Sequence, residues 1–150
     1  MSQTFVEILL FAIVAMNAAL LMFIAGVLRK VMNEMDGATF KHFLNSFYRH
    51  STHSVFMNAV LTIPFLGAIP YFYFYGFKNW WITTGLVLWF VAGSVGKIIK
   101  LPVFQVVAAL DDNDTDAQNK ARRRLHFGNV LQAVLNFIAA AMMIVSFIHR

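Results

Sequence analysis

Four long apolar runs dominate the pattern of hydrophobic and polar positions along the chain. They cover residues 5–28, 54–77, 80–110 and 126–149. Each run is long enough to cross the hydrocarbon core of a bilayer, which takes roughly 20 apolar residues in a helix. Only a helix satisfies its own backbone hydrogen bonds within lipid, so we predict that all four runs are helical.

A shorter amphipathic segment, FKHFLNSFYRHSTHS at residues 40–54, precedes the second run. Apolar side chains recur in it at helical spacing: Phe40, Phe43, Leu44, Phe47 and Tyr48. The opposite face carries His42, Ser46, Arg49 and His53. This spacing predicts a helix whose aromatic face lies against the bundle or in the membrane interface.

The stretch DDNDTDAQNKARRR, residues 111–124, precedes the fourth run, with acidic residues first and basic residues after them. This order favours a helix that begins near Asp114 or Thr115, because a carboxylate or hydroxyl there caps free backbone N–H groups. The helix is expected to continue into the fourth run.

Composition supports a membrane protein. Hydrophobic residues make up 59% of the 150 residues and charged residues only 13%, whereas soluble domains carry about 45–50% apolar and about 25% charged residues. We therefore predict an all-α fold: one integral membrane domain, residues 1–150, folded as a four-helix up-down-up-down bundle. Helical extensions on the cytoplasmic side are expected before the second and fourth runs.

The positive charges indicate an orientation. Ten of the twelve Lys and Arg residues lie in the two long connections, and only Lys78 and Arg150 lie elsewhere. The positive-inside rule then places both long connections in the cytoplasm and both termini outside, in a membrane such as the bacterial inner membrane. Lys97 and Lys100 are expected to extend their long side chains to the cytoplasmic interface.

The net charge of +5 is interpreted in the same way, as a signal for topology or for contact with anionic lipid, and not for nucleic acid. The expected partners are the lipid bilayer and either further copies of the chain or another membrane-complex subunit. The chain has no cysteine, which excludes disulfides, thiolate metal ligands and cysteine nucleophiles.

Histidines and amides are the candidate site residues. His50, His53 and His126 are predicted on the same side of the membrane and are candidate ligands for a transition metal or haem, since imidazole is a common metal ligand. Asn129, Gln132 and Asn136 share one face of the fourth run, one turn from His126. Intramembrane polar groups either bind a ligand or hydrogen-bond neighbouring helices. With Asn58 of the second run, the three amides are candidate ligand contacts, and His126 is the candidate catalytic base.

The layout of the chain resembles that of the anthrone oxygenase-like family of small four-helix membrane proteins. The resemblance covers about residues 45–145 and rests on Pro102 in KLPVFQVVAAL, on the loop DDNDTDAQNKARRR, and on Asn129 in HFGNVLQ. It implies cofactor-free oxygenation of a polyketide anthrone, as in some family members. The chain departs from the family pattern at Phe104 and Gln132, where the family usually has an asparagine and an arginine.

Three functions remain open from the sequence. One is a cofactor-independent oxygenase or related oxidoreductase that binds a flat lipophilic substrate within the bundle. Another is a redox subunit that binds haem or quinone near the histidines. The third is an oligomeric channel or assembly module without catalysis.

Overall fold

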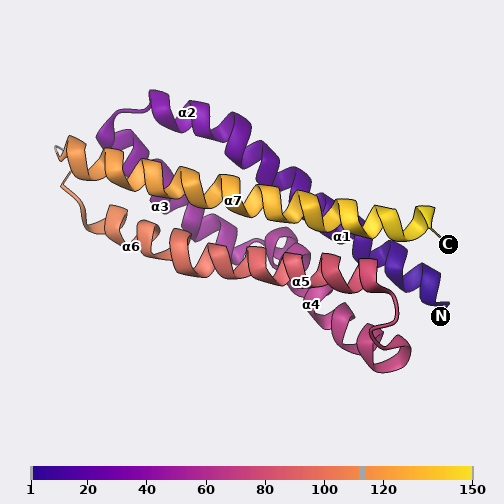
Figure 1. Cartoon of the computed structure of the whole chain (residues 1–150). Helices are drawn as coiled ribbons and strands as arrows, with labels where there is room; N and C mark the ends of the chain where they lie inside the picture. The colour runs from indigo at the N-terminus through magenta and orange to yellow at the C-terminus, as the bar shows by residue number, and fades with distance from the viewer. Residues whose placement is uncertain (1, 112–113, 150) are drawn as a thin grey trace.

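The computed structural model describes residues 2–111 and 114–149, and within these ranges the chain is helical, with no strand. In chain order the elements are α1 (Gln3–Phe23), the π-helical turn η1 (Ile24–Leu28), α2 (Arg29–Glu34), α3 (Gly37–His53), α4 (Val55–Tyr75), α5 (Trp80–Val95), the π-helical turn η2 (Gly96–Lys100), α6 (Leu101–Ala109) and α7 (Thr115–Ile148) (Figure 1).

Four continuous helices are long and apolar enough to cross a membrane: Gln3–Glu34, Val55–Tyr75, Trp80–Ala109 and Thr115–Ile148. The first comprises α1, η1 and α2, and the third comprises α5, η2 and α6. The predicted helical runs are therefore confirmed. The amphipathic segment is also helical, because it forms most of α3.

Short polar side chains cap the N-termini of α3 and α7. Asp36 accepts a hydrogen bond from the Thr39 backbone N–H at 2.7 Å, before α3, and that bond lowers the pKa of Asp36 below its ordinary value. Asp114 accepts from the Ala117 N–H at 2.9 Å, so α7 begins at Thr115, as the order of charges predicted.

Two hydrophobic cores follow one another along the bundle. The first joins α1, α4, α5 and the second half of α7, through Leu10, Val14, Ala68, Tyr71, Ile82, Leu86, Trp89, Ala139, Ala140 and Met143. The second joins α2, α3, α6 and the first half of α7, through Met32, Phe40, Leu44, Val103, Val107, Ala121 and Leu125. In the second core α3 takes the place that α4 has in the first.

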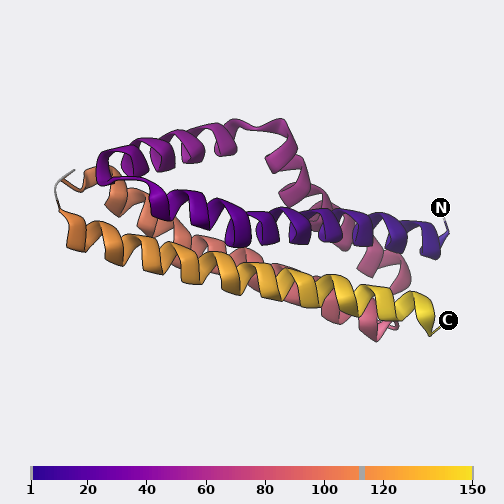
Figure 2. The ribbon, with the colours of Figure 1, turned by 90° about the horizontal axis from the view of Figure 1, so that it is seen from above.

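The two ends of the molecule differ. Both termini and the α4–α5 turn lie at one end, and the α2–α3 and α6–α7 connections lie at the other, in both views (Figures 1 and 2). The aromatic face of α3 is turned to the bundle, since Phe40 and Leu44 are buried. Of the two placements predicted for this helix, the structure has the one against the bundle.

The α5–α7 interface is close-packed. A Cβ built on Gly85 would lie 2.6 Å from Cγ of Met143 and 2.9 Å from the carbonyl oxygen of Ala139. The helix α4 is packed differently: it lies mainly against α1, which it crosses obliquely in both views. Phe65 of α4 meets Phe90 of α5 edge to face, with ring centroids 5.6 Å apart. This arrangement leaves room between α4 and α5.

Candidate functional site

A layer of polar side chains lies between the two cores. Asn17 donates to Oδ1 of Asn136 at 3.1 Å and so links α1 to α7. Asn136 donates in turn to the Gln132 carbonyl at 2.9 Å, and Nζ of Lys100 donates to Oε1 of Gln132 at 2.7 Å. One chain of hydrogen bonds therefore connects three of the four candidate membrane spans.

Both π-helical turns lie at the level of this layer. The Arg29 N–H bonds the Ile24 carbonyl, and the Leu101 N–H bonds the Gly96 carbonyl, each five residues back. After η2, Pro102 has no N–H for the usual bond four residues back, so the regular ladder is also interrupted there. Lys100 ends η2, so the widened turn carries the ammonium that bonds Gln132. Such turns are frequent at functional sites.

A cavity of about 550 Å³ opens beside Lys100. Its polar lining comprises Asn17, Thr62, Ser94, Lys97, Lys100 and Gln132. Its remaining lining is aromatic, aliphatic or glycine: Leu61, Phe65, Trp89, Phe90, Gly93 and Gly96. The volume falls within the range of roughly 300–1,000 Å³ that ligand pockets occupy. The cavity therefore has polar groups at one side and flat apolar walls.

Trp89 forms part of the cavity wall, with its indole nitrogen buried behind the ring surface. Its side chain is 7% exposed, and its Nε1 has no hydrogen-bond partner within the described residues. A buried donor without a partner costs about 1–3 kcal/mol, so a native structure rarely leaves one without a reason.

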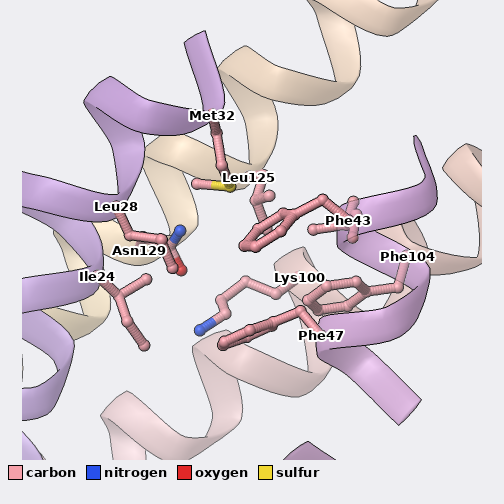
Figure 3. Close-up of a pocket in the computed structure, with 10 residues that line it drawn as sticks. Ile24, Leu28, Met32, Phe43, Phe47, Lys100, Phe104, Leu125 and Asn129 are labelled. Atoms are coloured by element: carbon pink, nitrogen blue, oxygen red, sulfur yellow. The ribbon is translucent and has the colours of Figure 1, made fainter. Parts of the chain in front are cut away.

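A smaller void of about 30 Å³ lies on the other side of Lys100. In Figure 3 the Lys100 side chain crosses this void below Phe43 and Asn129, and its terminal nitrogen lies on the side of Ile24 and Phe47. A void of this size holds little more than a water molecule. Lys100 thus separates a small apolar void from the cavity large enough for a ligand.

The three amides of the fourth span lie in different surroundings within the bundle. Asn129, Gln132 and Asn136 are all buried, with exposed fractions of 3%, 7% and 1%. Gln132 lines the large cavity, Asn129 lines the small void, and Asn136 bonds Asn17. Asn58 lies apart from them: it is exposed and donates to the Thr52 carbonyl at 3.1 Å, at the start of α4.

The histidines lie in different places. Nδ1 of His53 is 2.8 Å from the Arg49 carbonyl, whereas His50 lines a cavity of about 290 Å³ between α1, α3 and α4. His126 lines a third cavity, formed by α2 and α7. Within residues 2–111 and 114–149, no three side chains of the metal-binding types gather into a possible metal site. None of these histidines lines the large cavity.

A buried carboxylate cluster lies near the end that holds the termini. Oε1 of Glu7 accepts from the Tyr71 hydroxyl at 2.7 Å, from Nδ2 of Asn79 at 3.1 Å and from Nε2 of Gln3 at 2.9 Å. Asn79 also donates to Oγ of Ser146 at 2.7 Å. The cluster links α1, α4, the start of α5 and α7 by hydrogen bonds at this end of the bundle.

Two of these features were not predicted from the sequence, and for Glu7 only its partners were not. Lys100 was expected to reach the interface, but the structure pairs its ammonium with Gln132. Trp89 gave no signal, because a tryptophan in an apolar run is an ordinary core residue. Glu7 did give a signal, because a lone carboxylate inside an apolar run needs partners. Its partners Tyr71 and Asn79 are far from it in sequence and could not be identified.

Comparison with protein-family models, with curated protein sequences and with solved structures gave no match to this chain.

Proposed function

We propose that this protein binds a flat lipophilic molecule with one or more acceptor oxygens, in the cavity bordered by Lys100, Gln132 and Trp89. The four apolar helices cross the membrane alternately, with the long basic connections in the cytoplasm and the termini outside. Bacterial inner membrane is the setting that this charge pattern suits.

The observation that carries the proposal is a charged donor, Lys100, beside flat apolar walls. Lys100 and Trp89 both line the cavity, and so do the rings of Phe65 and Phe90. An oxygen on the ligand would accept from Lys100, and its rings would pack on Trp89 and the two phenylalanines. Quinones, phenols and aromatic acids have this combination of groups.

The route of entry is from the lipid. Leu61 and Phe65 of α4 and Phe90 of α5 border the cavity and are 46%, 48% and 36% exposed on the surface of apolar helices. A ligand dissolved in the bilayer would pass between α4 and α5, where contacts between the helices are few. This entry favours a lipophilic molecule over a soluble one.

Among redox ligands the cavity favours a quinone over haem. Haem iron is usually held by His, Cys, Met or Tyr, and none of these residue types lines the cavity. A quinone needs only hydrogen-bond donors for its carbonyl oxygens. The oxygenase chemistry that the family resemblance implies would use the same cavity, with Lys100 stabilising negative charge on a substrate oxygen.

Fluorescence of Trp89 provides a direct test. Replacing Trp80 and Trp81 with Phe leaves Trp89 as the only tryptophan, and the protein in lipid nanodiscs is titrated with 1,4-naphthoquinone, a quencher. We expect saturable quenching, and binding about tenfold weaker in Lys100→Met, since a bond to a charged donor contributes about 1.5–3 kcal/mol.

The control is Lys30→Met, which removes the same charge at an exposed position outside the cavity. It should bind as the parent does. Quenching that rises linearly without saturation, and equally in all three proteins, would contradict the proposal, because that is the behaviour of a quencher dissolved in lipid.

A further inference from the structure

A basic cavity of about 350 Å³ lies near the end opposite the termini, between α2 and α7. Its lining consists of six nitrogen-bearing side chains: Arg29, Asn33, Asn119, Arg122, Arg123 and His126. No carboxylate is among them. Three guanidinium groups around one cavity repel one another unless an anion or solvent ions neutralise them.

Arg122 is held rigidly at this cavity. Its terminal nitrogens donate to the carbonyls of Met32, Met35 and Asp36, which end α2, and its guanidinium carbon lies 4.1 Å from the centroid of the Phe40 ring. The remaining guanidinium nitrogen, Nε, is shielded from solvent and has no partner within the described residues.

His126 supplies a second shielded nitrogen of the same kind. Its Nδ1 is buried and has no hydrogen-bond partner in the part of the chain that the structure describes, although the whole residue is only half-buried. Arg122 and His126 lie one turn apart on α7 and both line the cavity, although these two nitrogens are buried behind its surface.

We propose that this cavity binds a phosphate group. Guanidinium groups form paired hydrogen bonds to phosphate oxygens, and Arg29, Arg122 and Arg123 bring three of these groups to one cavity. Basic cavities between membrane helices on the cytoplasmic side bind the head groups of anionic lipids. The group belongs either to such a lipid or to a soluble phosphate.

The test compares these two sources. Native mass spectrometry counts phospholipid retained on protein from nanodiscs of phosphatidylcholine with or without phosphatidylglycerol, and a parallel titration adds inorganic phosphate to protein in phosphatidylcholine alone. Retention of phosphatidylglycerol that resists inorganic phosphate assigns the site to a lipid head group. Displacement by phosphate, or thermal protection by phosphate alone, assigns it to a soluble anion.

The chain offers a matched control. Arg123 and Arg124 are neighbours and both exposed, but only Arg123 lines the cavity. We expect Arg123→Gln and Arg29→Gln each to weaken binding at least fivefold, because each loses a charge-assisted bond, and Arg124→Gln to leave it unchanged. Equal losses in Arg123→Gln and Arg124→Gln would overturn the proposal in favour of diffuse attraction to charged lipid. Absence of binding in every arm would also overturn it.

Discussion

At the scale of single residues, the polar groups inside this bundle differ in what they do. Glu7 is fully buried, and its Oε1 accepts hydrogen bonds from Gln3, Tyr71 and Asn79, which links three parts of the chain. Lys100 is paired with only one side chain and borders a cavity large enough for a ligand. The two residues therefore call for different tests.

Removing the Tyr71 hydroxyl tests whether its hydrogen bond to Glu7 stabilises the bundle. Tyr71→Phe keeps the ring in its core and deletes the 2.7 Å bond to Glu7, so we expect the free energy of unfolding to fall by about 1–2 kcal/mol. Denaturation by sodium dodecyl sulfate in mixed micelles measures this difference. Tyr73→Phe is the control, since Tyr73 is 82% exposed; an equal loss in both variants would show that the bond to Glu7 is not the cause.

The sequence predicted the amide stripe of α7 but not the hydrogen bond between Lys100 and Gln132. Asn129, Gln132 and Asn136 were predictable because helical spacing places them on one stripe of α7. Lys100 and Trp89 were not, because their roles depend on which residues of α7 and α4 face them. Those contacts are set by the tertiary structure, and no local pattern encodes them.

At the scale of helices, α5 packs closely against α7, whereas α4 and α5 leave a cavity between them. Gly85 allows α5 to touch α7 with no room for a methyl group, whereas the neighbouring α4 lies against α1 and leaves a cavity on its α5 side. The close-packed α5–α7 pair then forms one wall of the cavity, and α4 forms the wall opposite.

Adding a methyl group tests this contrast. Gly85→Ala forces Cβ against Met143 and the Ala139 carbonyl, so we expect a loss of stability of about 1–3 kcal/mol from overpacking. Gly93→Ala in the same helix meets nothing within 4 Å and should be neutral or slightly stabilising, because Ala favours a helix over Gly. Thermal unfolding in detergent compares the two; a similar midpoint in both would contradict the close α5–α7 contact.

Helices were the most predictable level of this structure. Apolar length marked the four spans, and Asp114 marked the start of α7, because capping chemistry is local. The π-helical turns and the oblique α4 were not predicted. Pro102 was visible in the sequence, but whether a proline gives a kink, a π-helical turn or a helix end depends on the neighbouring helices.

At the scale of the whole molecule, the proposed orientation follows from charge and agrees with the arrangement of the two ends. The basic connections share one end, and the termini share the other. The phosphate cavity would then lie on the cytoplasmic side, and the Glu7 cluster would lie on the outer side.

The lack of cysteine makes this orientation easy to test, because any introduced thiol is the only one. We expect Lys78→Cys, in the α4–α5 turn, to react with a membrane-impermeant maleimide on intact bacterial cells. Lys120→Cys, exposed in the first turns of α7, should react only after the membrane is opened. The reverse pattern would invert the orientation.

A side chain that fills the cavity between α4, α5 and α7 should exclude a lipophilic ligand from it. Gly93 lines the cavity and Gly26 does not, yet a Cβ at either position meets nothing within 4 Å. In protein that retains Trp89 as its only tryptophan, the titration with 1,4-naphthoquinone is repeated for Gly93→Phe and Gly26→Phe. Our account predicts that Gly93→Phe loses saturable quenching and Gly26→Phe keeps it; unchanged binding in a folded Gly93→Phe protein would contradict it.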